Sequence, residues 1–286
     1  MTISLDDSYR YCEQITRHAA KNFYYSFLLL PREKRLSLYA IYAFMRYCDD
    51  AVDEPVEYKE QISSVAMCRE QLDMVLNKTV PDHPLFPAFI DSIDKYNIPS
   101  KYLYEVLEGM EMDLVKKRYE TFEELKKYCY HAASAVGLVT LQVFGYSKQD
   151  KVYPLAVDCG IALQMTNIIR DLKEDAYRDR IYFPRCDWNQ YGLSEDDFKT
   201  SRPSSLMTSY LSSVVQQTEQ FYQSAYKLIP YIDKDSRCAL SAMIDIYHHI
   251  LLKIKDHNYD VFSRRISLPP LQKIGIGLKS VLREKI

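Results

Sequence analysis

The sequence contains little glycine, and this scarcity limits the folds that it can adopt. Only 7 of its 286 residues are glycine, whereas an average protein has about 7%. Residues 100–153 also lack proline entirely. Turns and strand ends depend on both residue types, whereas helix interiors disfavour them. With 47% hydrophobic residues and no low-complexity tract, the sequence predicts an all-α globular protein, folded as a single domain over residues 1–286.

The sequence lacks the motifs of several kinds of cofactor site. The seven cysteines are scattered without a C-x-x-C pair, and the six histidines show no ligand spacing. This pattern argues against a zinc site and indicates reduced thiols that act as small core residues. Neither G-x-G-x-x-G nor a P-loop occurs, so no nicotinamide or ATP site is expected. The net charge of −2 gives the chain no overall attraction for nucleic acid.

Membrane-targeting signals are missing as well. The first residues lack a basic stretch followed by an apolar core, so no signal peptide is expected. No segment approaches 18 apolar residues without a charge, so no transmembrane helix is expected. Together with reduced thiols, these absences predict a cytoplasmic protein. Peripheral contact with the inner face of the membrane stays open.

What the sequence does contain is an oxygen-rich stripe in the segment 164–175, which follows an apolar helical run. Gln164, Asn167, Asp171 and Asp175 stand above one another on one helix face, because residues three or four apart are neighbours there. Two carboxylates at i and i+4 repel each other by a few tenths of a kcal/mol. This cost makes sense if a cation lies between them, although a solvated acidic face is the more common explanation of an isolated copy.

A second copy of the motif favours a bound cation over a solvated acidic face. Asp49 and Asp53 repeat the i, i+4 spacing at the end of another apolar run. Hard divalent cations such as magnesium take oxygen ligands, often from one or two carboxylates and substrate phosphates. Two such faces, opposed across a helical bundle, predict metal ions around a diphosphate. Arg46, one turn before Asp49, suits either a phosphate contact or an intrahelical ion pair of little energetic worth.

Removing a diphosphate from an allylic carbon also requires an apolar cavity and a wall that tolerates a carbocation. Helices in a bundle can enclose such a cavity. The 25 tyrosines and 11 phenylalanines supply aromatic faces, which stabilise cations. Composition selects none of them, although Tyr42 and Tyr182 lie near the two acidic motifs.

Helix breakers divide the chain into expected elements. The expected helices span residues 6–22, 31–55, 58–77, a short segment ending near 96, 102–117, 122–144, 155 to the end of the second acidic motif, 205–229, 234–256 and a short final segment after 270. Asp6 or Asp7 is the expected cap of the first helix. Gly109, Gly137 and Gly160 lie inside helical patterns at a cost of about 1 kcal/mol each. Close helix packing or close approach of a ligand would explain them.

Five motifs together resemble the squalene/phytoene synthase family. They are Cys48–Asp53, Gly109–Asp113, Tyr128–Tyr130 with Ala133–Gly137, Asn167–Asp175 and Arg180–Pro184. The match extends from about residue 10 to residue 275. The resemblance implies an isoprenoid-synthase helical bundle around a central apolar cavity. It also implies magnesium-dependent head-to-head condensation of two prenyl diphosphates.

The resemblance further assigns roles to individual residues. Magnesium and diphosphates would be held by Asp49, Asp53, Asn167, Asp171 and Asp175. The phosphate contacts would come from Arg46, Arg170, Arg264 and Lys273. The positions matching the lining of the reaction centre are Tyr42, Tyr130, Gln164, Tyr182 and Tyr247, and Tyr130 is the expected handler of a proton or cation. The chain departs from the family pattern at Ser134 and Asp179, where glycine is usual.

Bulky residues indicate the length of the substrate. Phe27 and Tyr39 are large, where relatives that form C40 products often have a smaller residue at the first of these positions. Each methylene excluded from an apolar cavity costs about 0.8 kcal/mol. This favours farnesyl over geranylgeranyl diphosphate. The segments Lys21–Pro31 and Ala133–Gly137 most resemble bacterial presqualene diphosphate synthases of hopanoid pathways.

The expected function is therefore synthesis of presqualene diphosphate from two farnesyl diphosphates. Magnesium is the expected cofactor, with manganese as an alternative, and NADPH is not expected for this step. One alternative carries the intermediate on to squalene, dehydrosqualene or phytoene. Another is a non-catalytic assembly factor of the same fold, but such proteins typically lose the aspartates that this chain retains. The downstream pathway enzyme is unknown. Asp171→Asn is expected to remove turnover with little loss of stability.

Overall fold

Helices form nearly all of the regular structure in the computed structural model. It describes residues 3–20, 22–53 and 58–285, and gives only the backbone at 51–53, 58–59 and 285. In chain order the helices are α1 (Leu5–Ala19), α2 (Phe23–Phe27), α3 (Arg32–Asp53), α4 (Tyr58–Leu76), α5 (Phe86–Tyr96), α6 (Ser100–Val115), α7 (Phe122–Cys129), α8 (Ala135–Phe144), α9 (Val152–Tyr177), α10 (Arg185–Gln190), α11 (Ser205–Tyr226), α12 (Lys234–Asp256) and α13 (Pro270–Lys285). Within the described residues, β pairing is limited to two isolated bridges. The predicted all-α class is confirmed.

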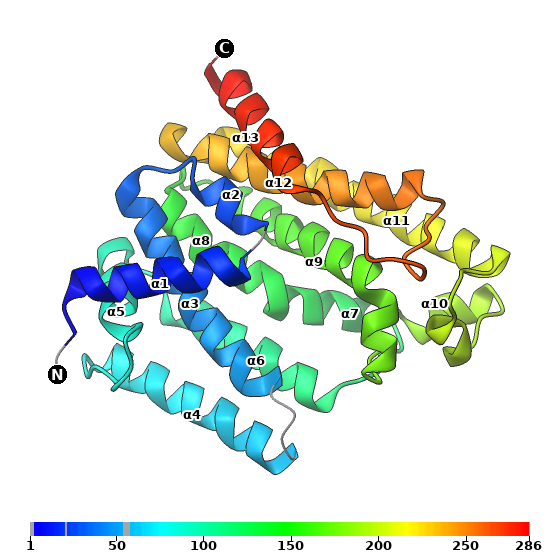
Figure 1. Cartoon of the computed structure of the whole chain (residues 1–286), viewed down its shortest axis with the longest axis horizontal. Coiled ribbons are helices and arrows are strands. Elements are labelled where there is room, and N and C mark those ends of the chain that lie inside the picture. The colour runs from blue at the N-terminus through cyan, green and yellow to red at the C-terminus, as the bar shows by residue number, and fades with distance from the viewer. Residues whose placement is uncertain (1–2, 21, 54–57, 286) are drawn as a thin grey trace.

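Helix α9 lies at the centre of the bundle, with α8, α11 and α12 packed around it (Figure 1). Ile161, Ala162 and Ile169 on this helix have no exposed surface. By length and composition α9 could cross a membrane, but 61% of its most apolar window is buried inside the protein, as in a core helix. Helix α3 packs against α1, α4 and α5 on the other side. The second acidic motif thus sits on the central helix.

The cap of the first helix lies two or three residues before the predicted Asp6 or Asp7. Ser4 is the cap, and its hydroxyl accepts a hydrogen bond from the backbone N–H of Asp7 at 3.1 Å. Asp6 and Asp7 instead occupy the first turn, where their charges favour the positive end of the helix dipole. The predicted end of the second long helix near Pro55 and its neighbour Glu54 lie outside the described residues.

The helix predicted over 122–144 is interrupted by a π-helical turn at Tyr130–Ser134. This turn packs between α6 and α9, and two glycines make the approach possible. A Cβ on Gly160 would lie 2.4 Å from Ser134 Cα, and one on Gly109 would lie 2.9 Å from the carbonyl carbon of His131. Close helix packing therefore accounts for both glycines. Gly137 has its nearest neighbour at 3.8 Å and lines a cavity instead.

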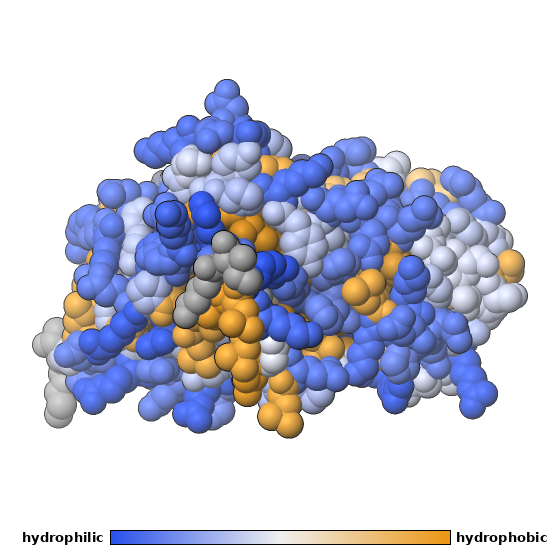
Figure 2. Space-filling view, turned by 90° about the horizontal axis from the view of Figure 1, so that it is seen from above, coloured by the Kyte–Doolittle hydropathy of each residue, from blue (hydrophilic) through white to orange (hydrophobic). Residues whose placement is uncertain are grey.

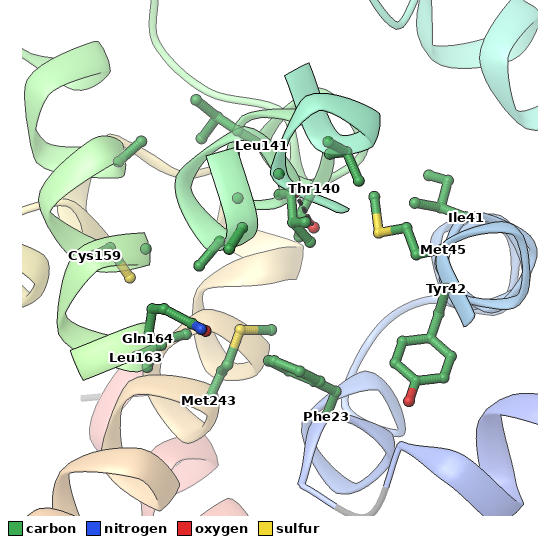
Figure 3. A pocket seen from close by; sticks show the side chains of 18 of the residues that line it. Phe23, Ile41, Tyr42, Met45, Thr140, Leu141, Cys159, Leu163, Gln164 and Met243 are labelled. Atoms are coloured by element: carbon green, nitrogen blue, oxygen red, sulfur yellow. Dashed lines mark hydrogen bonds between the residues drawn. The ribbon is translucent and has the colours of Figure 1, made fainter. Parts of the chain in front are cut away.

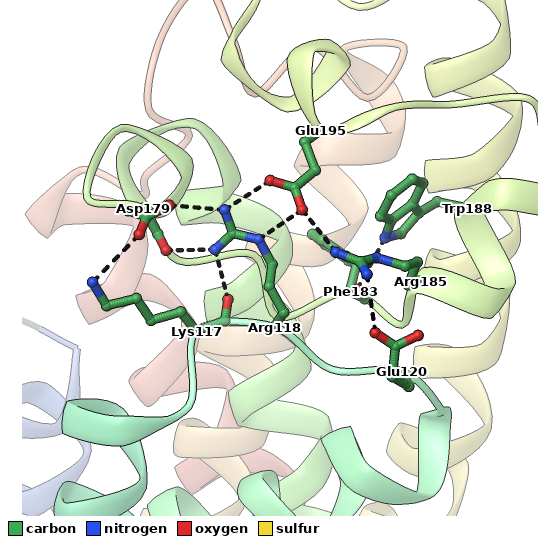
Figure 4. A network of polar contacts seen from close by, with 8 residues as sticks. All are labelled: Lys117, Arg118, Glu120, Asp179, Phe183, Arg185, Trp188 and Glu195. Carbon is green, nitrogen blue, oxygen red and sulfur yellow. Dashed lines mark hydrogen bonds and ion pairs between the residues drawn. The ribbon is translucent and has the colours of Figure 1, made fainter.

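A network of charged side chains holds the turn that follows α9 (Figure 4). Arg118 donates to the backbone oxygen of Asp179 at 2.6 Å, to its carboxylate at 2.8 Å and to the Glu195 carboxylate at 2.8 Å. Arg185 donates to the same Glu195 at 3.0 Å. Asp179 has φ +60°, a conformation that glycine adopts more easily. The ion pairs of Asp179 offset the conformational cost of a side chain at this φ. They also hold the segment that carries Arg180 and Tyr182 in place.

Candidate active site

Two connected spaces lie between the helices. The inner cavity has a volume of about 370 Å³ and lies between α2, α3, α6, α8, α9 and α12 (Figure 3). The outer compartment has a volume of about 1180 Å³. Both are lined by Phe23, Tyr42, Asp49, Met110, Asp113, Gln164 and Asn167. These shared residues form the boundary, so an elongated molecule can occupy both spaces.

The two spaces differ sharply in chemistry. The inner cavity is lined mainly by apolar side chains, among them Ile41, Met45, Leu163 and Met243 (Figure 3). The charged residues of the outer compartment are six basic and four acidic side chains, namely Arg17, Arg46, Arg170, Arg180, Arg265, Lys273, Asp49, Asp113, Asp171 and Asp175. An excess of positive charge beside carboxylates suits a polyanion that binds together with a cation. The arrangement fits a ligand with an anionic head and an apolar tail.

Asp171 in the outer compartment is paired with two arginines. Arg170 Nε donates to its Oδ1 at 2.8 Å, and Arg265 binds both carboxylate oxygens at 2.8 and 3.0 Å. Burial acts to raise the pKa of Asp171, but the hydrogen bonds and charges of these arginines outweigh it and hold the pKa below its usual value. Asp171 is therefore ionised at neutral pH.

Asp175, one turn further along α9, has a different environment. Burial, followed by the negative charge of Asp171, raises the pKa of Asp175 to about 7. The positive charges of Arg180 and Arg178 only partly oppose this effect. A carboxylate whose charge is this poorly compensated is a favourable place for a cation to bind.

Asn167 provides a third oxygen on the same helix face. Its Oδ1 is buried and has no hydrogen-bond partner among the described residues, while its Nδ2 lies 3.4 Å from Gln164 Oε1. Buried polar atoms are normally paired, so this oxygen is available to a ligand. Together with Asp49 and Asp175 around the outer compartment, it makes a set of hard oxygen donors that fits magnesium.

The protein alone does not complete a metal cluster. Among the described side chains, no group of three or more His, Cys, Asp or Glu residues is positioned to hold an ion. The side chain of Asp53, predicted as a ligand, lies outside the described residues, although its backbone ends α3. Ions bound here would need oxygens from the substrate as well, as is common for magnesium.

The structure is compatible with both alternatives for Arg46, an intrahelical ion pair and a phosphate contact. It forms an ion pair with Asp50 one turn later on α3, and it also lines the outer compartment. Its side chain is 38% exposed, so the pair contributes little to stability. Arg46 is thus positioned to reach an anion without the loss of a strong internal contact.

Aromatic rings mark the boundary between the two spaces. The Phe23 ring centroid lies 5.4 Å from that of Tyr247 and 6.5 Å from that of Tyr42. Burial raises the pKa of Tyr42 to about 12, although the charge of Arg46 opposes it, so the ring stays neutral. Neutral π faces stabilise a cation without attacking it. Tyr42 and Tyr247 were predicted here, whereas Phe23 entered the sequence analysis only as part of the segment Lys21–Pro31.

Asp113 forms the centre of a second polar group at this boundary. Tyr128 donates to its Oδ2 at 3.0 Å and Tyr182 donates to its Oδ1 at 2.8 Å. The two tyrosine rings stack with centroids 4.8 Å apart. Burial, followed by the negative charge of Asp113, raises the pKa of both phenols well above the usual value, so each remains a donor. The tyrosines hold the carboxylate in a fixed orientation toward the cavity.

The structure corrects the role predicted for Tyr130. Its hydroxyl donates to Glu105 at 2.8 Å and lies 3.1 Å from the Tyr153 hydroxyl, away from both spaces. Residues two apart on a helix point about 200° apart, so Tyr128 and Tyr130 cannot face the same cavity. Tyr128 lines the inner cavity. The boundary position therefore belongs to Tyr128.

This correction leads to a matched pair of variants. Tyr128→Phe should lower turnover by about 10-fold or more, because a hydrogen bond to a charged group is worth roughly 1.5–3 kcal/mol. Tyr130→Phe removes the same atom two residues away and should leave turnover within about 2-fold. Steady-state kinetics of both purified variants would check this. A larger loss in Tyr130→Phe than in Tyr128→Phe would restore the original assignment.

One of the predicted phosphate contacts also changes. Arg264 is exposed, and its neighbour Arg265 lines the outer compartment and binds Asp171. The two lie in an irregular segment before α13, where no helical periodicity exists to show which one points inward. Lys273 is buried and lines the compartment, as do Arg170 and Tyr182. Asp113 was visible in the sequence only as the end of a family motif.

Phe27 lies where the argument on substrate length requires it. Its ring is buried, lines the inner cavity, and packs against Tyr39 with centroids 6.3 Å apart. Phe23 stacks on it at 6.2 Å. Tyr39 is fully buried behind Phe27, so the Phe27 ring has a rigid support.

Comparisons with known proteins agree on the family and the fold. The squalene/phytoene synthase family model matches residues 16–272. A phytoene synthase of Arthrospira platensis is 32% identical over 295 residues, covering 98% of this chain and 94% of the relative. A crystal structure of a dehydrosqualene synthase in complex with ligand has a TM-score of 0.90 at 27% identity and covers 98% of both chains. The squalene synthase HpnC from Alicyclobacillus acidocaldarius has a TM-score of 0.82 at 26% identity, covering 91% of this chain and 97% of that chain.

Proposed function

The chain belongs to the squalene/phytoene synthase family, and from this premise we propose that it condenses two farnesyl diphosphates into presqualene diphosphate. The family resemblance and the isoprenoid-synthase fold predicted from the sequence are confirmed. The supporting observation is the junction between the basic outer compartment and the apolar inner cavity. A prenyl diphosphate has both a polyanionic head and a hydrocarbon tail, so it matches the two spaces together.

The outer compartment would bind the diphosphates. Arg46, Arg170, Arg265 and Lys273 supply positive charge on its walls. Asp49, Asn167 and Asp175 would hold magnesium, with Asp53 and Asp171 as the further acidic groups of the two motifs. Bound magnesium would supply neutralisation of the charge that develops on the departing diphosphate. Asp171 would at the same time hold Arg170 and Arg265 in place through its ion pairs.

The boundary would accommodate the carbocation. Loss of one diphosphate leaves an allylic cation, and the double bond of the second substrate attacks it. Ring closure releases a proton and leaves one diphosphate on the cyclopropylcarbinyl product, without net oxidation or reduction. This step therefore needs no NADPH. Phe23, Tyr42 and Tyr247 would face the cation with neutral rings, and the apolar inner cavity would exclude water.

The inner cavity favours the shorter substrate. Its volume of about 370 Å³ lies near the low end of the range of about 300–1,000 Å³ for ligand pockets. Phe27, supported by Tyr39, occupies space that a longer chain would need. A second candidate is the C20 reaction, since the relative from Arthrospira platensis is named phytoene synthase. A third is continuation of the C15 reaction to dehydrosqualene, favoured by the structure with TM-score 0.90.

One product assay separates these reactions. The purified protein is incubated with magnesium and either farnesyl or geranylgeranyl diphosphate, with and without NADPH, and the products are identified by mass spectrometry. We expect presqualene diphosphate from farnesyl diphosphate in both conditions and little product from geranylgeranyl diphosphate. A hydrocarbon as the only product, or faster turnover of the C20 substrate, would contradict the proposal. No turnover of either substrate would favour the non-catalytic alternative.

A further inference from the structure

Helix α13 carries an apolar stripe that is not buried in the core. Leu271, Ile274, Leu278 and Leu282 are between 46% and 81% exposed. Their spacing of three and four residues places them on one face of the helix, over three turns or about 16 Å. Isolated exposed leucines are ordinary, but a continuous row marks an interaction surface.

The opposite face of α13 is firmly anchored to the bundle. Ile276 and Ser280 are buried. Arg283 donates to the Asp245 carboxylate of α12 at 2.6 Å. A Cβ on Gly277 would lie 3.7 Å from the Leu29 side chain. The exposed stripe is therefore the outward face of a helix whose inward face already packs against the bundle.

The stripe lies on a helix that also borders the outer compartment. Pro270 and Lys273, at the start of α13, line that compartment. Leu28 at the end of α2, a helix that packs against α13, is also exposed. Seen from above, apolar surface gathers in the middle of the face from which α13 projects (Figure 2). The apolar stripe and part of the compartment wall thus belong to the same helix.

Helix α13 has a positive net charge, whereas the whole chain has a negative one. Pro270–Lys285 contains four basic residues and one acidic residue, whereas the whole chain has a net charge of −2. Lys279 is exposed on the flank of the stripe, and Arg264 is exposed just before the helix. An apolar stripe with basic flanks is typical of helices that lie in the interface of an anionic bilayer.

We propose that the α13 stripe docks on the surface of a bilayer that contains anionic phospholipid. Leu271, Ile274, Leu278 and Leu282 enter the acyl boundary, while Lys279 and Arg264 meet the headgroups. The proposal rests on the proposed function for its purpose, because prenyl diphosphates and their condensation products are amphiphiles that partition into membranes. Docking through α13 places the outer compartment, which the start of this helix lines, close to the membrane surface.

The test is a vesicle sedimentation experiment with the full-length protein. Vesicles of phosphatidylcholine alone and of phosphatidylcholine mixed with phosphatidylglycerol are compared at low and high salt. We expect preferential binding to the anionic vesicles that weakens with salt. The double variant Leu278→Ser/Leu282→Ser should reduce the bound fraction by about 10-fold or more. The control Leu206→Ser/Met67→Ser changes two similarly exposed side chains elsewhere and should bind like the wild type.

Turnover of farnesyl diphosphate without vesicles, together with the molar mass in solution, completes the test. Both double variants should retain wild-type turnover, which separates failure of docking from failure of the proposed function. Equal vesicle binding by wild type and the α13 variant would overturn the proposal. A wild-type dimer that the α13 variant converts to a monomer would also overturn it, because a second copy of the chain would then cover the stripe.

Discussion

Asp175→Asn is expected to stabilise the protein while it removes most of the turnover. The pKa of Asp175 is raised to about 7 from an ordinary value of 3.8, so the folded state disfavours its ionised form. The wild type therefore loses stability as pH rises above 3.8, and the full penalty is present above about pH 7. Asparagine carries no charge, so the variant should be more stable by roughly 2–4 kcal/mol at pH 8. Near pH 4 the two proteins should differ little.

Turnover of the Asp175→Asn variant should fall, although its stability should rise. Asparagine keeps one oxygen but loses the charge that would hold magnesium, so turnover should fall by about 10²–10³-fold. Urea unfolding without metal at pH 5 and pH 8, together with initial rates at saturating magnesium, measures both effects. A variant that is less stable than the wild type at pH 8 would contradict the environment described for Asp175. Unchanged turnover would contradict its place in the metal site.

Asp171→Asn should reduce turnover similarly but should destabilise the protein. The sequence predicted little loss of stability, because the substitution relieves repulsion from Asp175. In the structure, however, Asp171 is bound by Arg170 and Arg265, and removal of its charge weakens the binding of both guanidinium groups. Arg265 then keeps only its longer ion pair with Glu174 at 3.8 Å. Hydrogen bonds to charged groups are worth roughly 1.5–3 kcal/mol, so a loss of about 1–3 kcal/mol is expected.

The pH dependence of this loss gives a second check. The pKa of Asp171 is held below its usual value, so the carboxylate contributes stability above about pH 4. That contribution disappears as pH falls through the folded-state pKa. Urea unfolding of wild type and variant should therefore differ at pH 7 and converge in acid. Asp175→Asn is the matched control, since it makes the same substitution one turn away. Equal stability changes in the two variants would show that the arginines do not distinguish the two aspartates.

The helices themselves were largely predictable. Segments such as α4 (Tyr58–Leu76) and α12 (Lys234–Asp256) begin and end within one residue of their predicted limits, since breakers and periodicity are local properties of the chain. The π-helical turn at Tyr130–Ser134 was not predictable. It depends on the missing side chains of Gly109 and Gly160, which lie in two other helices. A glycine signals that something approaches closely, but it does not identify what approaches.

The residues of the site likewise divide into those that the sequence predicted and those that only the structure could place. Asn167, Asp171 and Asp175 share a helix face, and this followed from their spacing alone. The choice between Tyr128 and Tyr130 required the rotation of α7 against α6. The choice between Arg264 and Arg265 required the path of an irregular segment. In both cases neighbouring positions offer the same chemistry, and only packing decides which side chain faces the cavity.

By itself, the sequence determined the helical fold, the oxygen donors of the two acidic motifs and the family. These depend on contacts within one helix turn or on motifs read directly from residues. The tertiary structure decided that Asp171 is paired with arginines, that Asp175 has no ion pair among the described side chains, and that an apolar stripe stays outside on α13. Arg265 and Asp171 are 94 positions apart, so no local pattern could reveal their ion pair. Burial and charge pairing depend on residues that only the fold brings together, and they give two identical side chains on one helix different properties.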